Sequence, residues 1–157
     1  MKTKNILTFL LLIFISFGYS QKKELRNANK FYDSGEYLSA LDLLETSKSI
    51  FDNSDDKIKS QVMLLYGKIY TSTEDFELAI KSFNNSRKLG VNKQDLNSEI
   101  NKLETTIITS AIADNESENF SDAAKKLKIV YDINPENNAL YLYYAASSAV
   151  NSNDMSL

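Results

Sequence analysis

The sequence predicts an all-α protein built from repeated pairs of helices. One apolar pattern at helical spacing occurs three times along the chain, and each copy follows another amphipathic segment. Pro135 is the single proline among 157 residues, and the four glycines are scattered, so little in the composition interrupts long helices. We therefore expect six to seven helices after residue 21, joined by short turns, and no sheet.

The N-terminus, residues 1–20, has the layout of a secretory signal peptide. Lys2 and Lys4 precede an apolar run over residues 6–17, and small residues close the segment. The alternative is a membrane anchor, but a spanning helix needs about 20 apolar residues and this run is shorter. The sequence thus predicts an exported protein, periplasmic or extracellular after cleavage. The mature chain, residues 21–157, would meet the membrane only through this transient leader.

Three stretches of the mature chain share one pattern, in which an aromatic residue is followed by alanine and then by a large apolar residue. The aromatics are Tyr37, Phe76 and Phe120, the alanines are Ala40, Ala79 and Ala123, and the apolar residues are Leu44, Phe83 and Leu127. Spacings of three and four residues place these side chains on one face of a helix. The residue before each aromatic is acidic or an amide, as a helix N-terminus favours: Glu36, Asp75 and Asn119.

The segment before each of these helices carries a small residue where the paired helix would approach most closely. These residues are Ala28, Gly67 and Ala111. We expect Gly67 to be a packing residue, because a larger side chain would push the two helices apart. Apolar spacing from Leu96 onward predicts that the helix before the third copy begins early, near Asn92 or Lys93. Gly90 is placed to end the preceding helix.

This pattern resembles the tetratricopeptide repeat (TPR), a helix–turn–helix unit of about 34 residues. The small residues and alanines above match two of the family's positions, and its proline falls on Pro135 in one unit only. The family's aromatic in the first helix falls on Phe31 and Tyr70, whereas the third unit has Asp114, which is a departure. The resemblance implies a right-handed α-solenoid, with units near 21–54, 60–93 and 104–137 and an incomplete fourth unit from 139.

The last residues resemble the start of another second helix. Asn153, Asp154 and Met155 match the turn and the first helical position of the earlier units. We therefore expect the sequence to be an N-terminal fragment, the alternative being a natural end capped by a lone helix. In the first case the side of the final helix that meets its missing partner would face water and promote self-association. That side is expected to include Leu142, Ala146 and Ala149.

The composition argues against an enzyme. With no His and no Cys, a zinc cluster, a Ser-His-Asp triad and a thiolate nucleophile are all excluded, and the glycines form no phosphate-binding loop. The acidic stretch Asp52–Lys57 lacks the glycine of a calcium loop, so we expect a turn that caps the next helix. The chain has 18 basic and 21 acidic residues, which gives no electrostatic reason to bind nucleic acid. We expect no cofactor and no metal.

The resemblance places a partner-binding groove on the first helix of each unit. Its positions here are Asn29, Tyr32, Lys68, Thr71, Ile112, Asn115, Tyr143 and Ser147. The family's clamp for a C-terminal carboxylate is not matched, since only Asn29 agrees with it. The expected partner is a protein or peptide, bound as a helix or an extended segment. The chain would then be an exported scaffold; the alternative is an N-terminal sensor or targeting module whose catalytic or cell-wall-binding domain lies beyond Leu157.

Overall fold

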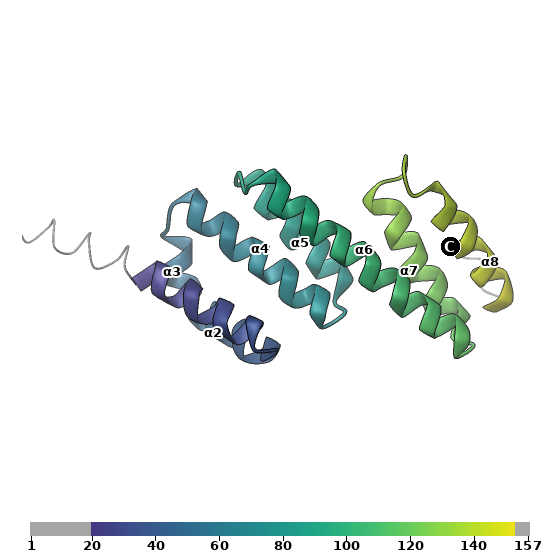
Figure 1. Cartoon of the computed structure of the whole chain (residues 1–157), viewed down its shortest axis with the longest axis horizontal. Coiled ribbons are helices and arrows are strands. Elements are labelled where there is room, and N and C mark those ends of the chain that lie inside the picture. The colour runs from purple at the N-terminus through teal and green to yellow at the C-terminus, as the bar shows by residue number, and fades with distance from the viewer. Residues whose placement is uncertain (1–19, 153–157) are drawn as a thin grey trace, which may run out of the picture. The chain divides into compact units, whose positions relative to one another are not determined.

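The chain is all-α over the residues that the computed structural model describes, 20–152 (Figure 1). The expected signal peptide lies outside these residues except for Ser20, and so does the terminal stretch around Met155. The described part of the first helix covers residues 20–33. It is followed by α2 (Tyr37–Thr46), α3 (Lys48–Asp52), α4 (Asp56–Ser72), α5 (Phe76–Lys88), α6 (Lys93–Glu116), α7 (Phe120–Ile133) and α8 (Ala139–Ser152). As expected, residues 20–152 contain no strand.

Helix α3 is the element that the sequence did not predict, and it brings the described residues to eight helices instead of six or seven. The helical path is interrupted at Ser47 and resumes for five residues. Phe51, at the end of this short helix, is only 4% exposed and joins the core. Helix α3 therefore adds a buried aromatic side chain to the core of unit 1.

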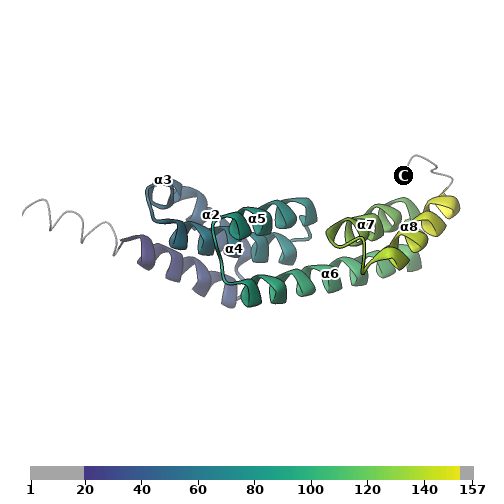
Figure 2. The ribbon, with the colours of Figure 1, turned by 90° about the horizontal axis from the view of Figure 1, so that it is seen from above.

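The described residues divide into two compact units. Unit 1 contains residues up to Thr73 together with Glu77–Leu96, and unit 2 contains Glu74–Phe76 and the residues from Asn97 onward. In unit 1, α2 runs back alongside the first helix in both views and also contacts α4 (Figures 1 and 2). Its core cluster includes the predicted Ala28, Ala40 and Leu44, all fully buried.

Gly67 is the point of close approach between α4 and α5, as predicted. A Cβ atom added to Gly67 would overlap three ring carbons of Phe83, the farthest of them, Cζ, at 2.8 Å. The Phe83 ring is 1% exposed and has little room to move aside. Farther along the same pair, Ser86 Oγ donates a hydrogen bond of 2.7 Å to the Ser60 carbonyl. Only glycine therefore permits this spacing between the two helices.

The turn inside each helix pair has one residue with a positive φ angle at the same place. This residue is Gly35 (φ 78°), then Glu74 (φ 62°) and then Glu118 (φ 62°). In two of the turns the following amide closes a bond to the carbonyl five residues back, from Glu36 to Phe31 at 2.9 Å and from Asn119 to Asp114 at 2.8 Å. This is the 6→1 bond of a Schellman motif, which glycine adopts without strain. The repeat thus extends to the backbone of the turn, although the residue type changes.

Helix starts follow the sequence expectations in part. Helix α6 begins at Lys93, and Asn92 Oδ1 accepts hydrogen bonds from the amides of Gln94 and Asp95. Asp55 caps α4 by accepting a 2.8 Å hydrogen bond from the Ile58 amide, which confirms the turn expected there. Glu36 and Asn119 occupy the N-cap positions of α2 and α7, as expected, but neither side chain makes a capping hydrogen bond.

In unit 2, α7 packs against α8, and Ala111, Leu127 and Ala145 form a buried cluster. Helix α8 has the predicted extent, and two of the three residues expected to face water do so. Leu142 and Ala146 are exposed, as predicted, whereas Ala149 is only 5% exposed. Helix α8 buries Ala145, Ser148 and Ala149. Its solvent-exposed side therefore carries its large apolar residues.

Asp114 lies in α6 at the position where the repeat pattern has an aromatic residue in the other units. Its Oδ2 atom lies 2.7 Å from Nζ of Lys126 on α7, and both side chains are largely shielded from solvent. Lys126 Nζ also donates to Ser110 Oγ at 2.8 Å, and Ser110 donates to Glu74 Oε2 at 2.6 Å. An ion pair supported by a hydroxyl group therefore links α6 and α7 there.

Candidate functional site

A pocket of about 750 Å³ opens on unit 1 between the first helix and α4. Leu25 of the first helix and Ile58 and Leu65 of α4 lie at its base, and all three are at most 7% exposed. Their apolar side chains face this pocket because both helices repeat such residues every three or four positions. The pocket therefore has a floor that could hold an apolar side chain of a partner.

Basic side chains dominate the rim of this pocket. Lys22 and Arg26 come from the first helix, Lys57 from the first turn of α4, and Lys68 from farther along α4. The single acidic residue among the lining residues is Asp55, whose carboxylate caps α4. The rim thus carries four positive charges and one negative charge, although the whole chain has a net charge of −3.

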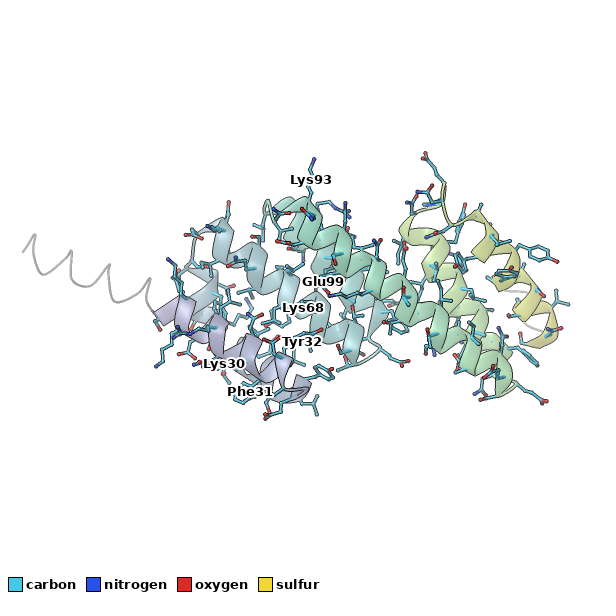
Figure 3. The ribbon with its side chains drawn as sticks, viewed as in Figure 1. Lys30, Phe31, Tyr32, Lys68, Lys93 and Glu99 are labelled. Atoms are coloured by element: carbon cyan, nitrogen blue, oxygen red, sulfur yellow. The ribbon has the colours of Figure 1, made fainter. Side chains whose placement is uncertain are left out.

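Lys68 is held in place by an aromatic ring. Its Nζ atom lies 4.3 Å from the centroid of the Tyr32 ring, so the ammonium group sits within cation–π distance (Figure 3). Tyr32 in turn packs against Tyr37 of α2, with ring centroids 5.5 Å apart. This chain of contacts fixes a positive charge at the edge of the pocket.

Four predicted groove residues fall in unit 1, and the structure brings three of them together. Asn29 and Lys68 line the pocket, and Tyr32 contacts Lys68. The Asn29 Nδ2 atom donates a 2.8 Å hydrogen bond to the Leu25 carbonyl within its own helix. Thr71 differs: it is 8% exposed, and its hydroxyl donates to the Gly67 carbonyl at 2.8 Å. Thr71 therefore contributes to packing rather than to a contact surface.

The other four predicted residues fall in unit 2 on α6 and α8. Ile112 and Tyr143 are 52% and 68% exposed, and Ser147 is exposed as well. Asn115 accepts a 3.0 Å hydrogen bond from Ser148, the neighbour of the predicted Ser147. The Asn115 side chain is therefore engaged by a contact between α6 and α8.

Sequence reasoning predicted Lys68 but missed the other three basic residues of the pocket rim, which are Lys22, Arg26 and Lys57. Lys22 and Arg26 are four residues apart and Asn29 follows three residues later, a spacing that places all three on one helical face. That spacing was the available signal. Lys57 gave no such signal, because its place beside Lys22 depends on how α4 packs on the first helix.

A second pocket, of about 230 Å³, lies on a different face of α4 and was also not predicted. Tyr66 and Tyr70 stack there with centroids 6.0 Å apart, and Tyr66 Oη donates to Glu45 Oε1 at 2.8 Å. Burial, followed by the hydrogen bond to the Glu45 carboxylate, raises the pKa of Tyr66 well above its ordinary value. The phenol is therefore protonated at neutral pH and serves as a fixed donor.

No protein-family model, curated protein or solved structure matches this chain. Among residues 20–152, no helix is both long and apolar enough to span a membrane. In the same residues, no three acidic side chains gather as metal ligands would. The pocket of unit 1 combines a larger volume than the second pocket with apolar lining residues and convergent polar groups.

Proposed function

We propose that this chain is an exported scaffold with TPR-like repeats, arranged as a right-handed solenoid, that binds a segment of another protein. The observation that carries the proposal is the unit 1 pocket, which joins an apolar floor to polar groups on the first helix and on α4. Each of these is the first helix of its pair. The lining residues of the pocket include amide, ammonium and guanidinium groups, which suit binding of a peptide segment.

The repeated internal geometry supports the TPR-like part of the proposal. Three helix pairs share a buried small residue in the first helix and a buried alanine in the second. Their turns share a residue with positive φ at one position. A sequence can repeat by chance, but three turns with one backbone conformation at the same place favour repeated structural units.

A peptide-display selection against the purified chain tests the binding function. We expect enrichment of peptides that bind the parent chain and lose affinity for the Leu65→Asp variant, which places a charge on the pocket floor. The matched control is Leu78→Asp, at a residue that is 44% exposed and does not line this pocket. Melting curves of both variants show whether they are folded. Failure to enrich any peptide, or equal loss in both folded variants, contradicts the proposal.

The mass of the protein recovered from expressing cells tests export. We expect a mature chain that begins at Gln21 and is found outside the cytoplasm. Recovery of an intact chain that begins at Met1 in the cytoplasmic fraction contradicts export, and leaves the binding function to the selection experiment.

A further inference from the structure

We infer that the unit 1 pocket takes an acidic peptide segment that also carries an apolar side chain; this inference rests on the proposed binding function. The charge of the rim is the first observation. Four basic residues and one acidic residue line the pocket in a chain whose net charge is negative. A local excess of positive charge of this kind attracts acidic groups and disfavours basic ones.

The acidic residue in the rim has another role, which strengthens the inference. Asp55 accepts the hydrogen bond from the Ile58 amide and caps the N-terminus of α4. Its carboxylate therefore offsets the positive end of a helix as well as the nearby lysines. The charge left for a ligand is carried by Lys22, Arg26, Lys57 and Lys68.

The floor of the pocket distinguishes a peptide from other anionic ligands. Leu64, which is partly exposed, and the nearly buried Leu25, Ile58 and Leu65 form an apolar base under the charged rim. Inorganic phosphate or a nucleic-acid backbone would use the charges but leave this base uncovered. A segment in which Asp or Glu flanks Leu or Phe would use both surfaces at once.

Lys68 is poised to pair with such a segment. Its ammonium group is held 4.3 Å from the Tyr32 ring centroid before any ligand binds. Pairing therefore loses less side-chain freedom than it would for an unrestrained lysine. The same ring contact limits how far the charge can swing away from the pocket.

Fluorescence anisotropy with three synthetic peptides tests the inference. They share one length and have leucine at alternate positions, with glutamate, glutamine or lysine between. We expect the glutamate peptide to bind the purified chain about tenfold more tightly than the glutamine peptide at low salt, with the lysine peptide weakest. The advantage should shrink as ionic strength rises, because salt screens charges at a surface rim. Equal binding of the glutamate and glutamine peptides, or tighter binding of a single-stranded oligonucleotide, overturns the inference.

Variants of the rim test the residues assigned to it. Arg26→Glu and Lys68→Glu should each weaken binding of the glutamate peptide by about threefold to tenfold. The control, Lys30→Glu, makes the same charge change on the first helix at an exposed residue that does not line the pocket (Figure 3), and should have a smaller effect. Melting temperatures establish that each variant is folded. Equal weakening by Lys30→Glu and Arg26→Glu overturns the inference.

Asp55→Asn provides a variant that should gain affinity. Asparagine caps helices as well as aspartate does, so the start of α4 is preserved while one negative charge leaves the rim. The glutamate peptide should bind about threefold more tightly, and the glutamine peptide should be unaffected. No gain for the glutamate peptide in the folded variant overturns the acidic preference.

The two proposals fail in different ways. If display-selected peptides lose affinity for Leu65→Asp but are not acidic, the pocket binds peptides and the inference about their charge is wrong. If no peptide binds at the pocket under any condition, the binding function itself is wrong.

Discussion

The pair α4–α5 in unit 1 and the pair α6–α7 in unit 2 share a turn conformation but fill their closest contact differently. In the first pair Gly67 meets the ring of Phe83, whereas in the second Ala111 lies in one buried cluster with Leu127. Glycine, the smaller of the two first-helix residues, faces phenylalanine, the larger of the two second-helix residues. What repeats is therefore the combined volume at this position, because close-packed interiors tolerate changes that conserve volume better than changes that do not.

The same two pairs also differ one turn farther along the first helix. Tyr70 of α4 packs its ring against Tyr66, whereas Asp114 of α6 forms an ion pair with Lys126 of α7. An aromatic contact and a shielded charge pair thus occupy equivalent places. The aromatic contact lies within α4, whereas the ion pair joins α6 to α7, so the equivalent position serves a different role in each pair.

The largest effect should come from enlarging Gly67. Leucine at this position collides with the buried ring of Phe83, and overpacking costs about 1–3 kcal/mol, so Gly67→Leu should lower the free energy of unfolding by about 3 kcal/mol. Gly67→Ala should cost less, because alanine favours the helix by about 1 kcal/mol relative to glycine. Chemical denaturation measures both. A Gly67→Leu protein as stable as the parent would show that the helices can separate freely.

A double substitution converts the contact of unit 1 into that of unit 2. Gly67→Ala with Phe83→Leu recreates the Ala–Leu combination, so its free energy of unfolding should lie within about 1 kcal/mol of the parent value. The double variant should be more stable than the sum of the two single changes predicts, with a coupling of about 0.5–3 kcal/mol, as for residues in direct contact. Additive effects in the full double-mutant cycle would contradict volume compensation.

Removing Lys126 should destabilise unit 2 by an intermediate amount. Lys126→Met leaves the carboxylate of Asp114 shielded and without its cation, which should cost about 1–2 kcal/mol. The adjacent Lys125→Met variant is the control, because its ion pair with Asp122 is well exposed and should contribute less than about 0.5 kcal/mol. Denaturation curves that rank the two variants equally would argue against a role for the shielded pair.

The smallest effect should come from the turns. Glu118 has a φ angle of 62°, so Glu118→Gly should relieve strain and raise the free energy of unfolding by about 0.5–1 kcal/mol. Gly35→Ala makes the reverse change at the equivalent position, and should lower it by about 1 kcal/mol. Thermal melts with opposite shifts would support a shared turn. Two shifts of the same sign would mean that side chains, not φ, decide the stability of these turns.

The sequence predicted the parts of the fold that follow from helical spacing. The buried alanines, the close approach at Gly67 and the early start of α6 all depend on residues separated by three or four positions. The short helix α3 was missed because five residues are too few to show a period. Ala149 was wrongly expected to face water, because alanine at 145, 146 and 149 gives no sign in the sequence of which side chains face the core.

The candidate site was less predictable than the fold. Asn29 and Lys68 were expected to face a partner, and both line the unit 1 pocket. The charge of its rim could not be assembled from the sequence, because Lys57 joins it through the packing of α4 on the first helix. Thr71 was expected to face a partner, but its hydroxyl donates a hydrogen bond to a carbonyl of its own helix instead of facing outward.

The core of unit 1 includes a cluster of residues that lie close together in the sequence, which affects the order in which the chain folds. This cluster draws only on residues between Leu25 and Tyr70. Contacts between segments this close in the chain require little loop closure, and helical proteins rich in them fold in about microseconds to milliseconds. Synthesis is slower, at about 5–20 residues per second. The first helix pair and α4 can therefore assemble while the residues of unit 2 are still being added.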